Sequence, residues 1–246
     1  MFRRIKFIFW LFFALVVCVV FFGTEESCAN LHKKNNKEGI VYWHGDSNQS
    51  KVALTFDDGP NEPYTSQILD ILKEFNIKAT FFLIGKNVQN YPEVARRIIR
   101  EGHIIGNHTH DHPELILKLN SQIRYQIKKT EEVLVDATGV KPYLFRPPYG
   151  LDTPLVWREA EKLNYIVIKW SASAFNGRKD MLPGQIVDKL RREVENGSII
   201  LFHDGNRTTK NADRSRIVEA LPMLIESLQK RSYQFVTVPQ LLGFEN

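Results

Sequence analysis

Two adjacent carboxylates, Asp57 and Asp58, stand where an apolar run meets a Gly-Pro turn. The run before them, Val52 to Phe56, carries no charge and predicts a buried strand. In α/β proteins, binding and catalytic sites are built at the carboxyl ends of strands. Neighbouring side chains on an extended segment point to opposite sides, so one carboxylate can bind an ion while the other faces a substrate. The competing interpretation is that one of them only caps the next helix.

Three histidines, His108, His110 and His112, lie within five positions further along the chain. If this segment closes into one helical turn, His108 and His112 share a face. If it stays extended, all three share a face. Pro113 restricts His112 toward extended geometry, but the spacing alone decides for neither arrangement. Together with Asp58, two imidazoles would complete the three-ligand set of a catalytic zinc site, which also accepts other divalent ions.

Two more polar segments follow predicted strands. Arg146-Pro-Pro-Tyr-Gly150 comes after one, and Leu201-Phe-His203-Asp204 ends another. Parallel strands share one carboxyl edge of a sheet, so all four polar segments are expected to meet there. That convergence indicates a site with basic, acidic and metal-ligating groups.

The elements that must position these side chains alternate in type. Apolar runs predict seven strands, at residues 52–56, 78–84, 103–107, 143–146, 165–170, 198–202 and 234–238. Helical spacing predicts six helices, at residues 64–75, 92–100, 121–137, 153–163, 182–195 and 212–230, with Gly139 ending the third. Residues 40–43 suit a short outlying strand. The alternation predicts an α/β fold with a parallel sheet, open or closed into a barrel.

The first 29 residues have the pattern of an export signal. A basic start precedes an unbroken apolar run over residues 7–22, and small residues surround Cys28. We expect cleavage after Ala29. The alternative is an uncleaved membrane anchor formed by the same run. Either way the domain is expected outside the cytoplasm, in the cell envelope or beyond it, with the membrane involved only through this segment.

The remainder of the chain is expected to be a tether with a short lead-in strand, residues 30–50, and one catalytic domain, residues 51–246. The 43% hydrophobic content of the chain suffices for one sizeable core.

Both cysteines, Cys18 and Cys28, lie in the leader, so a disulfide framework is excluded from the domain. The leader carries a net charge of +1, which leaves +4 of the chain's +5 for the rest. This mild excess suits an anionic envelope polymer, and no basic block with interleaved aromatics suggests a nucleic-acid partner.

Taken together, four motifs resemble those of the polysaccharide deacetylases with a NodB homology domain, carbohydrate esterase family 4. They occur in the family's order as Thr55-Phe-Asp-Asp-Gly-Pro60, His108-Thr-His-Asp-His112, Arg146-Pro-Pro-Tyr-Gly150 and Leu201-Phe-His203. The resemblance runs from about Lys51 to Val238. It implies a distorted (β/α) barrel of about seven parallel strands and hydrolysis of the acetamide of an N-acetylated glycan.

The resemblance also implies one divalent metal ion. Asp58, His108 and His112 would hold it, and His110 would not. Zinc is expected first, with cobalt, nickel or manganese as alternatives.

The other roles are likewise implied by the resemblance. Asp57 would be the general base and His203 the general acid. Arg146 would order Asp57, Pro147 would support the site, and the backbone N–H of Tyr149 would face the oxyanion.

One stretch departs from the family pattern. Where the family has two Asp and a Trp after Trp170, this chain has Ser173, Asn176 and Gly177. The carboxylate that orients the catalytic His in relatives is therefore missing.

The expected substrate is peptidoglycan N-acetylglucosamine. Chitin oligomers, poly-N-acetylglucosamine and acetylxylan are alternatives, as is a catalytically impaired glycan-binding protein of the same fold.

Overall fold

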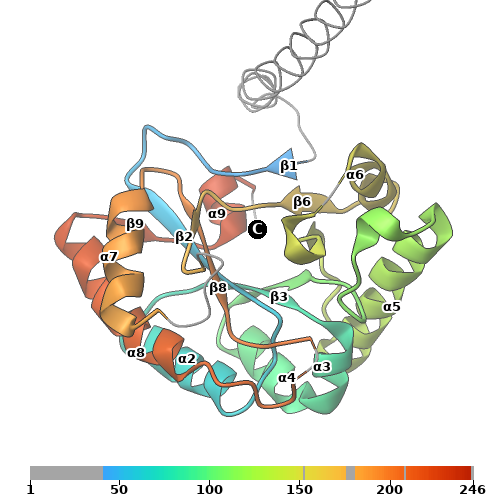
Figure 1. Ribbon diagram of the computed structural model, residues 1–246, viewed down its shortest axis with the longest axis horizontal. Coiled ribbons are helices and arrows are strands. Elements are labelled where there is room, and N and C mark those ends of the chain that lie inside the picture. Colours follow the sequence, from blue (N-terminus) through green and yellow to red (C-terminus); the bar gives the residue numbers. More distant parts are fainter. Residues whose placement is uncertain (1–40, 152, 176–180, 208, 245–246) are drawn as a thin grey trace, which may run out of the picture. The chain divides into compact units, whose positions relative to one another are not determined.

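The computed structural model describes residues 41–151, 153–175, 181–207 and 209–244. Within these ranges, one sheet has the strand order β1-β6-β5-β4-β3-β2-β8-β7, and β9 pairs with β2. The strands are β1 (Val41–Tyr42), β2 (Lys51–Asp57), β3 (Thr80–Leu83), β4 (Ile104–Asn107), β5 (Leu144–Phe145), β6 (Ile166–Ile168), β7 (Ala172–Ser173), β8 (Ile199–His203) and β9 (Gln234–Phe235). All pairings between these strands are parallel, and the sheet curls into a partial barrel (Figure 1).

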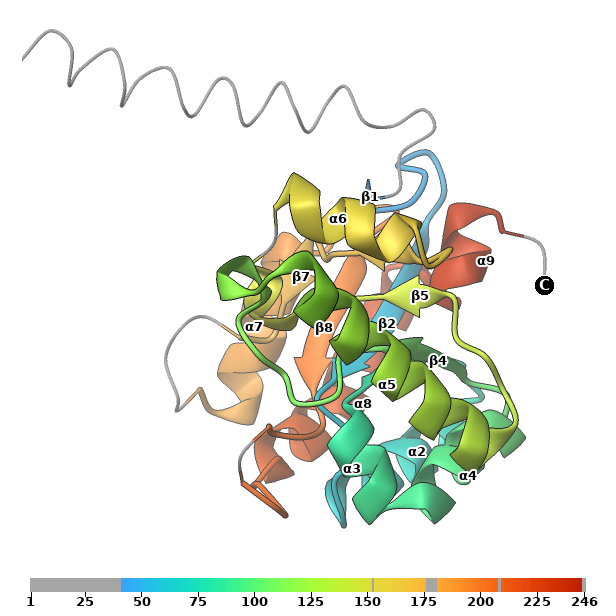
Figure 2. The ribbon, with the colours of Figure 1, turned by 90° about the vertical axis from the view of Figure 1, so that its right-hand side faces the viewer.

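Helices cover the outside of this curled sheet (Figures 1 and 2). They are α2 (Tyr64–Glu74), α3 (Gly85–Asn90), α4 (Pro92–Arg100), α5 (Asn120–Thr138), α6 (Pro154–Glu161), α7 (Pro183–Glu193), α8 (Ser215–Lys230) and α9 (Val238–Leu242). Two 3₁₀ turns, η1 (Leu115–Leu117) and η2 (Pro148–Gly150), lie between them. Neighbouring helices pack on one another, α7 on α8, α8 on α2, α4 on α5 and α5 on α6. Of the helices in the described ranges, none has the length and apolar content needed to cross a membrane.

Strand β2 explains how the sheet is buried on both faces. Val52, Leu54 and Phe56 belong to the core beneath the helices. The alternate residue Ala53 belongs to a second core, together with residues of β3, β5, β6, β8 and α9. Side chains alternate between the faces of a strand, so between Lys51 and Asp57 strand β2 has no face turned to water and carries no charge.

The predicted α/β fold is confirmed. Each of the seven predicted strands corresponds to an observed one, although β9 is shorter than predicted because α9 begins at Val238. All six predicted helices are present, and α5 ends at Gly139 in left-handed geometry, as expected. The predicted strand at residues 40–43 is the edge strand β1, which pairs with β6. The short elements α3, α9 and β7 were not predicted from the sequence, and α3 and β7 lie beside the site.

Several predictions lie outside the described residues. These are the export signal or anchor, residues 30–40 of the tether, and Asn176 and Gly177. They stay predictions.

A histidine directly before β4, His103, is buried and is expected to make the stability of the fold depend on pH. His103 is 3% exposed, its Nδ1 accepts the backbone N–H of Ala79 at 3.1 Å, and its ring contacts Phe81 edge-on. Burial, with a smaller effect from the charge of Lys78, lowers the pKa of His103 to about 4. The folded protein therefore holds this ring neutral at a pH where an unfolded chain protonates it.

We expect the free energy of unfolding to fall as the pH drops from about 6.5 to about 4. In that window the unfolded chain binds a proton at His103 that the folded chain does not, with a slope of up to about 1.4 kcal/mol per pH unit. The measurement is urea unfolding at several pH values for the parent and His103→Gln. The variant should show a shallower slope, and an identical slope would assign the acid sensitivity to other groups.

Candidate metal and catalytic site

Strand register places the side chains of Asp57 and His203 on the same face of the sheet. The two residues are paired across β2 and β8, and paired residues of parallel strands point to the same side. Both therefore face the interior of the curled sheet. Asp204 points to the opposite face, where its carboxylate accepts the Thr65 hydroxyl at 2.6 Å. Burial raises the pKa of Asp204 to about 7. Asp204 thus lies away from His203, as its position on the strand predicts.

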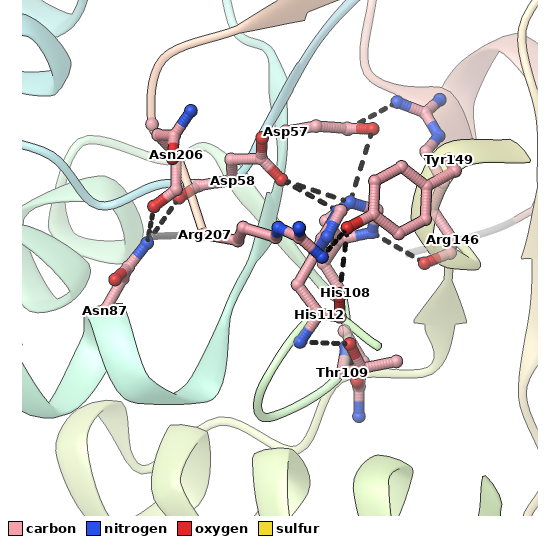
Figure 3. A network of polar contacts seen from close by, with 12 residues as sticks. Asp57, Asp58, Asn87, His108, Thr109, His112, Arg146, Tyr149, Asn206 and Arg207 are labelled. Atoms are coloured by element: carbon pink, nitrogen blue, oxygen red, sulfur yellow. Dashed lines mark hydrogen bonds and ion pairs between the residues drawn. The ribbon is translucent and has the colours of Figure 1, made fainter. Parts of the chain in front are cut away.

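Asp58 leaves the strand in left-handed geometry, with φ of 73°. Its Oδ1 lies 3.4 Å from Nε2 of His108 and 3.2 Å from Nε2 of His112 (Figure 3). One ligand atom from each of these three buried residues lies within 4.8 Å of the other two. Burial alone would raise the pKa of Asp58, but the neighbouring histidines bring it well below its usual range. A carboxylate and two imidazoles brought together in this way fit a divalent metal ion.

The loop that carries the histidines is neither helical nor extended. Thr109 and His112 both have positive φ, 67° and 55°. Side-chain bonds hold this shape, because the Thr109 N–H donates to Asn107 Oδ1 and the His112 N–H donates to Thr109 Oγ1. The expectation that Pro113 keeps His112 extended is wrong. The loop's own hydrogen bonds outweigh that local preference.

His110 points away from Asp58. Its backbone N–H donates to Gln126 Oε1, and its Nδ1 lies against Gly85 at the start of α3, where a Cβ would come within 2.4 Å. The described residues therefore group His108 and His112 with Asp58 and leave His110 outside.

A backbone contact fixes the tautomer of His108. Its Nδ1 lies 2.6 Å from the carbonyl oxygen of Arg146, so Nδ1–H donates there. The lone pair of Nε2 then faces Asp58, the orientation that a metal ligand needs.

Arg146 occupies the interior of the curled sheet and is fully buried. Its guanidinium donates to Asp57 Oδ1 at 2.7 Å, so the contact implied by the motifs is present. The remaining acceptors are Thr55 Oγ1 at 2.8 Å, the Lys169 carbonyl at 2.8 Å and the Ile168 carbonyl at 3.1 Å. Phe82 packs beneath it, with its ring centre 4.1 Å from Cζ. Asp57 is thereby held by a buried guanidinium that is itself fixed by three further hydrogen bonds.

Tyr149 covers one side of the group formed by Asp58, His108 and His112. It lies in η2 with φ of 60°, and its ring packs edge-on against the ring of His112. Arg207 donates to its hydroxyl (Figure 3). Asn87 of α3 joins the loops on the other side by donating to the Asp58 and Asn206 carbonyls. Neither Asn87 nor Arg207 carries a local sequence signal, and both were missed.

A cleft of about 790 Å³ opens over these groups. Its lining includes Pro147 and Trp170, with Asp57, Asp58, His108, His112, Tyr149 and His203. The cleft thus brings together all the predicted site residues except Arg146, which supports Asp57 from beneath. A polar centre with an aromatic wall suits a sugar.

Ser173 lies on β7 opposite Leu201, on the interior face that also carries His203. Its hydroxyl accepts the N–H of Phe175 at 3.1 Å. Burial lowers the pKa of the His203 imidazole, and the charges of Asp58 and Asp57 only partly oppose this.

Comparison with known proteins decides the family. The model of the polysaccharide deacetylases matches residues 44–168, half of the chain. The chain belongs to the polysaccharide deacetylase family. The curated relatives of the chain are named deacetylases, which hydrolyse linear amides, and the chain is an enzyme of this class.

Three similar proteins illustrate the likeness. A peptidoglycan N-acetylglucosamine deacetylase of Bacillus cereus is 40% identical over 199 residues, which cover 80% of this chain and 70% of that protein. The crystal structure of the Bc1960 peptidoglycan N-acetylglucosamine deacetylase, bound to a hydroxamate, has a TM-score of 0.78 at 37% identity, covering 84% of this chain and 94% of that one. A Bacillus anthracis pseudoenzyme of the same family has a TM-score of 0.76 at 28% identity, covering 83% of this chain and 69% of that one.

The grouping of ligands predicts which variants lose a metal ion. Purified protein should hold about one divalent ion per chain. His112→Ala or Asp58→Ala should lose it, because each removes one of three ligands. His110→Ala is the matched control and should keep it. The measurement is metal content by mass spectrometry after dialysis, and loss of the ion in His110→Ala but not in His112→Ala would overturn the ligand set.

Proposed function

We propose that the chain is a metal-dependent deacetylase of N-acetylglucosamine residues in peptidoglycan. The observation that carries this proposal is the grouping of Asp58, His108 and His112 beside the Arg146–Asp57 pair, at the floor of one cleft. Relatives named for the same substrate support it.

The residues suit hydrolysis of an acetamide. Asp58, His108 and His112 would hold a divalent cation, which would supply a Lewis acid and lower the pKa of water there. Asp57 does not join that ligand group, and its Oδ1 is held by Arg146. It is therefore free to accept the proton of the attacking water as general base.

The developing charge and the leaving group need two further residues. The Tyr149 backbone N–H donates to the oxyanion, a contact typically worth about 10²–10³ in rate. His203 donates a proton to the departing sugar amine, because an amide nitrogen leaves only when protonated. The products are acetate and a free amino sugar.

Peptidoglycan is also the N-acetylated polymer that an exported domain meets. Export by the leader, or anchoring through residues 7–22, is part of this proposal, as is a single catalytic domain over residues 51–246. Chitin oligomers, poly-N-acetylglucosamine and acetylxylan remain alternative substrates, and zinc remains the expected ion.

Acetate release across a panel of purified glycans tests the proposal. The panel holds peptidoglycan, chitin oligomers, poly-N-acetylglucosamine and acetylxylan, each with added zinc and with a chelator. We expect chelator-sensitive release that is fastest from peptidoglycan. Faster acetate release from another glycan would identify that glycan, and not peptidoglycan, as the substrate.

A second candidate, a glycan-binding protein with little catalysis, is favoured by Ser173. The family carboxylate is absent there, and one structural neighbour is a pseudoenzyme. A metal-loaded protein that binds glycans but releases no acetate from any of them would establish this alternative.

Asp57→Asn should keep the metal ion and lose turnover. The amide cannot accept a proton, and loss of a positioned base costs about 10²–10⁴ in rate. The measurement is kcat together with metal content. Near-normal acetate release by a metal-loaded Asp57→Asn protein would exclude Asp57 as the base.

Ser173→Asp should move the alkaline limb of the pH–rate profile upward. His203 must be protonated to act as the acid, and a carboxylate beside it favours the imidazolium and raises its pKa. Activity would then persist to higher pH, and turnover near neutral pH would rise.

The measurement is kcat against pH for both proteins on one acetylated oligosaccharide, with metal content checked. Ser173→Asn is the matched control, since it has the same shape without the charge. An unmoved limb in folded, metal-loaded Ser173→Asp would show that His203 is not the acid or is oriented by another group.

A further inference from the structure

The turn that presents the Tyr149 backbone is strained. Tyr149 and the next residue, Gly150, both have left-handed geometry, with φ of 60° and 63°. For a bulky residue such as tyrosine this conformation costs about 1–2 kcal/mol. Such a residue stays in place only where its surroundings hold it. Something must therefore fix the turn from outside.

Lys169 makes that contact. Its Nζ donates to the Gly150 carbonyl at 2.7 Å, at the end of the turn. On the other side, Gly150 packs so closely on Trp170 that a Cβ would come within 2.6 Å of the indole ring. The turn is thus held between an ammonium group and a ring.

Lys169 is itself held rigidly. It is 2% exposed, and its Nζ lies 4.9 Å from the ring centre of Trp43 and 5.6 Å from that of Trp170. Aromatic faces stabilise a cation that has lost water. Trp43 follows directly on β1, which pairs with β6 just before Lys169. A buried lysine needs polar partners, and its hydrogen bond to the turn is one of them.

Lys169 also contacts Arg146, the residue that holds the proposed general base Asp57. The Lys169 carbonyl accepts the Arg146 guanidinium at 2.8 Å, and Arg146 binds Asp57. One residue at the end of β6 therefore touches both the strained turn and the arginine that holds Asp57.

We propose that Lys169 is a positioning residue for the deacetylation reaction. Its ammonium group holds the Gly150 carbonyl and so fixes the turn in which Tyr149 presents its N–H to the oxyanion. The inference rests on the proposed role of Tyr149 and adds a residue outside the family motifs quoted above.

The test compares Lys169→Met with Lys169→Arg in the full-length chain. Methionine keeps the apolar stem and removes the donor, so kcat should fall about 10–100-fold while KM stays within about threefold. Arginine restores a cationic donor and should recover at least part of the lost kcat. Lys78→Met is the matched control, because Lys78 donates to the Glu101 carbonyl at the same 2.7 Å far along the chain from the turn. It should keep kcat within about twofold.

Hydrogen exchange of the metal-free protein gives a readout independent of activity. The amides of residues 149–151 should exchange faster in Lys169→Met than in the parent, while those of β2 and α5 stay unchanged. Lys78→Met should leave exchange at residues 149–151 unaffected. If Lys169→Met does not fold, Lys169→Gln takes its place with the same direction expected.

The inference is overturned if a folded, metal-loaded Lys169 variant without the ammonium keeps both kcat and amide exchange at residues 149–151 at parental values. It is also overturned if KM rises while kcat holds, because Lys169 would then act on binding alone. A parent that releases no acetate would instead refute the proposed function, and faster exchange would still report whether Lys169 holds the turn.

Discussion

The buried ion pair between Arg146 and Asp57 constrains the rest of the structure. A guanidinium in a protein interior is strongly destabilising unless its donors are satisfied, and removing one partner of such a pair typically costs about 3–5 kcal/mol. Here the curled sheet supplies the acceptors, Thr55 Oγ1 and two carbonyls at the end of β6, and Phe82 supplies the floor. The strands must curl far enough for β2 and β6 to reach one side chain. The curl of the sheet and the fixed position of Asp57 therefore depend on each other through Arg146.

The two-residue period of the strands was readable from the sequence. It places Asp57 and His203 on the interior face, and the apolar runs before them mark where each strand ends. The family motifs added the choice of ligands, which spacing alone left open between His110 and His112. Local pattern and motif order thus predicted the fold and which side chains meet at the carboxyl edge of the sheet, because the period of a strand and the position of its end are set by short-range rules.

What the sequence did not predict depends on backbone shape and on contacts between distant loops. His112 is left-handed despite the following proline, because Thr109 and Asn107 hold the loop through hydrogen bonds that no local rule foresees. Asn87 lies on a helix too short to show a period. Lys169 looks like an ordinary surface residue in sequence, yet it is buried against a turn 19 residues away.

The position of Trp170 in the cleft lets its fluorescence report on whether the cleft is occupied. This indole lines the cleft, touches Gly150 and lies near the Arg146 guanidinium, so its surroundings change when the cleft fills. Trp43 borders the same lysine. Two of the four tryptophans in the chain are therefore close to the turn at Tyr149 and Gly150. Intrinsic fluorescence can consequently follow the arrival of a sugar in real time without a dye, even in a variant that cannot turn it over.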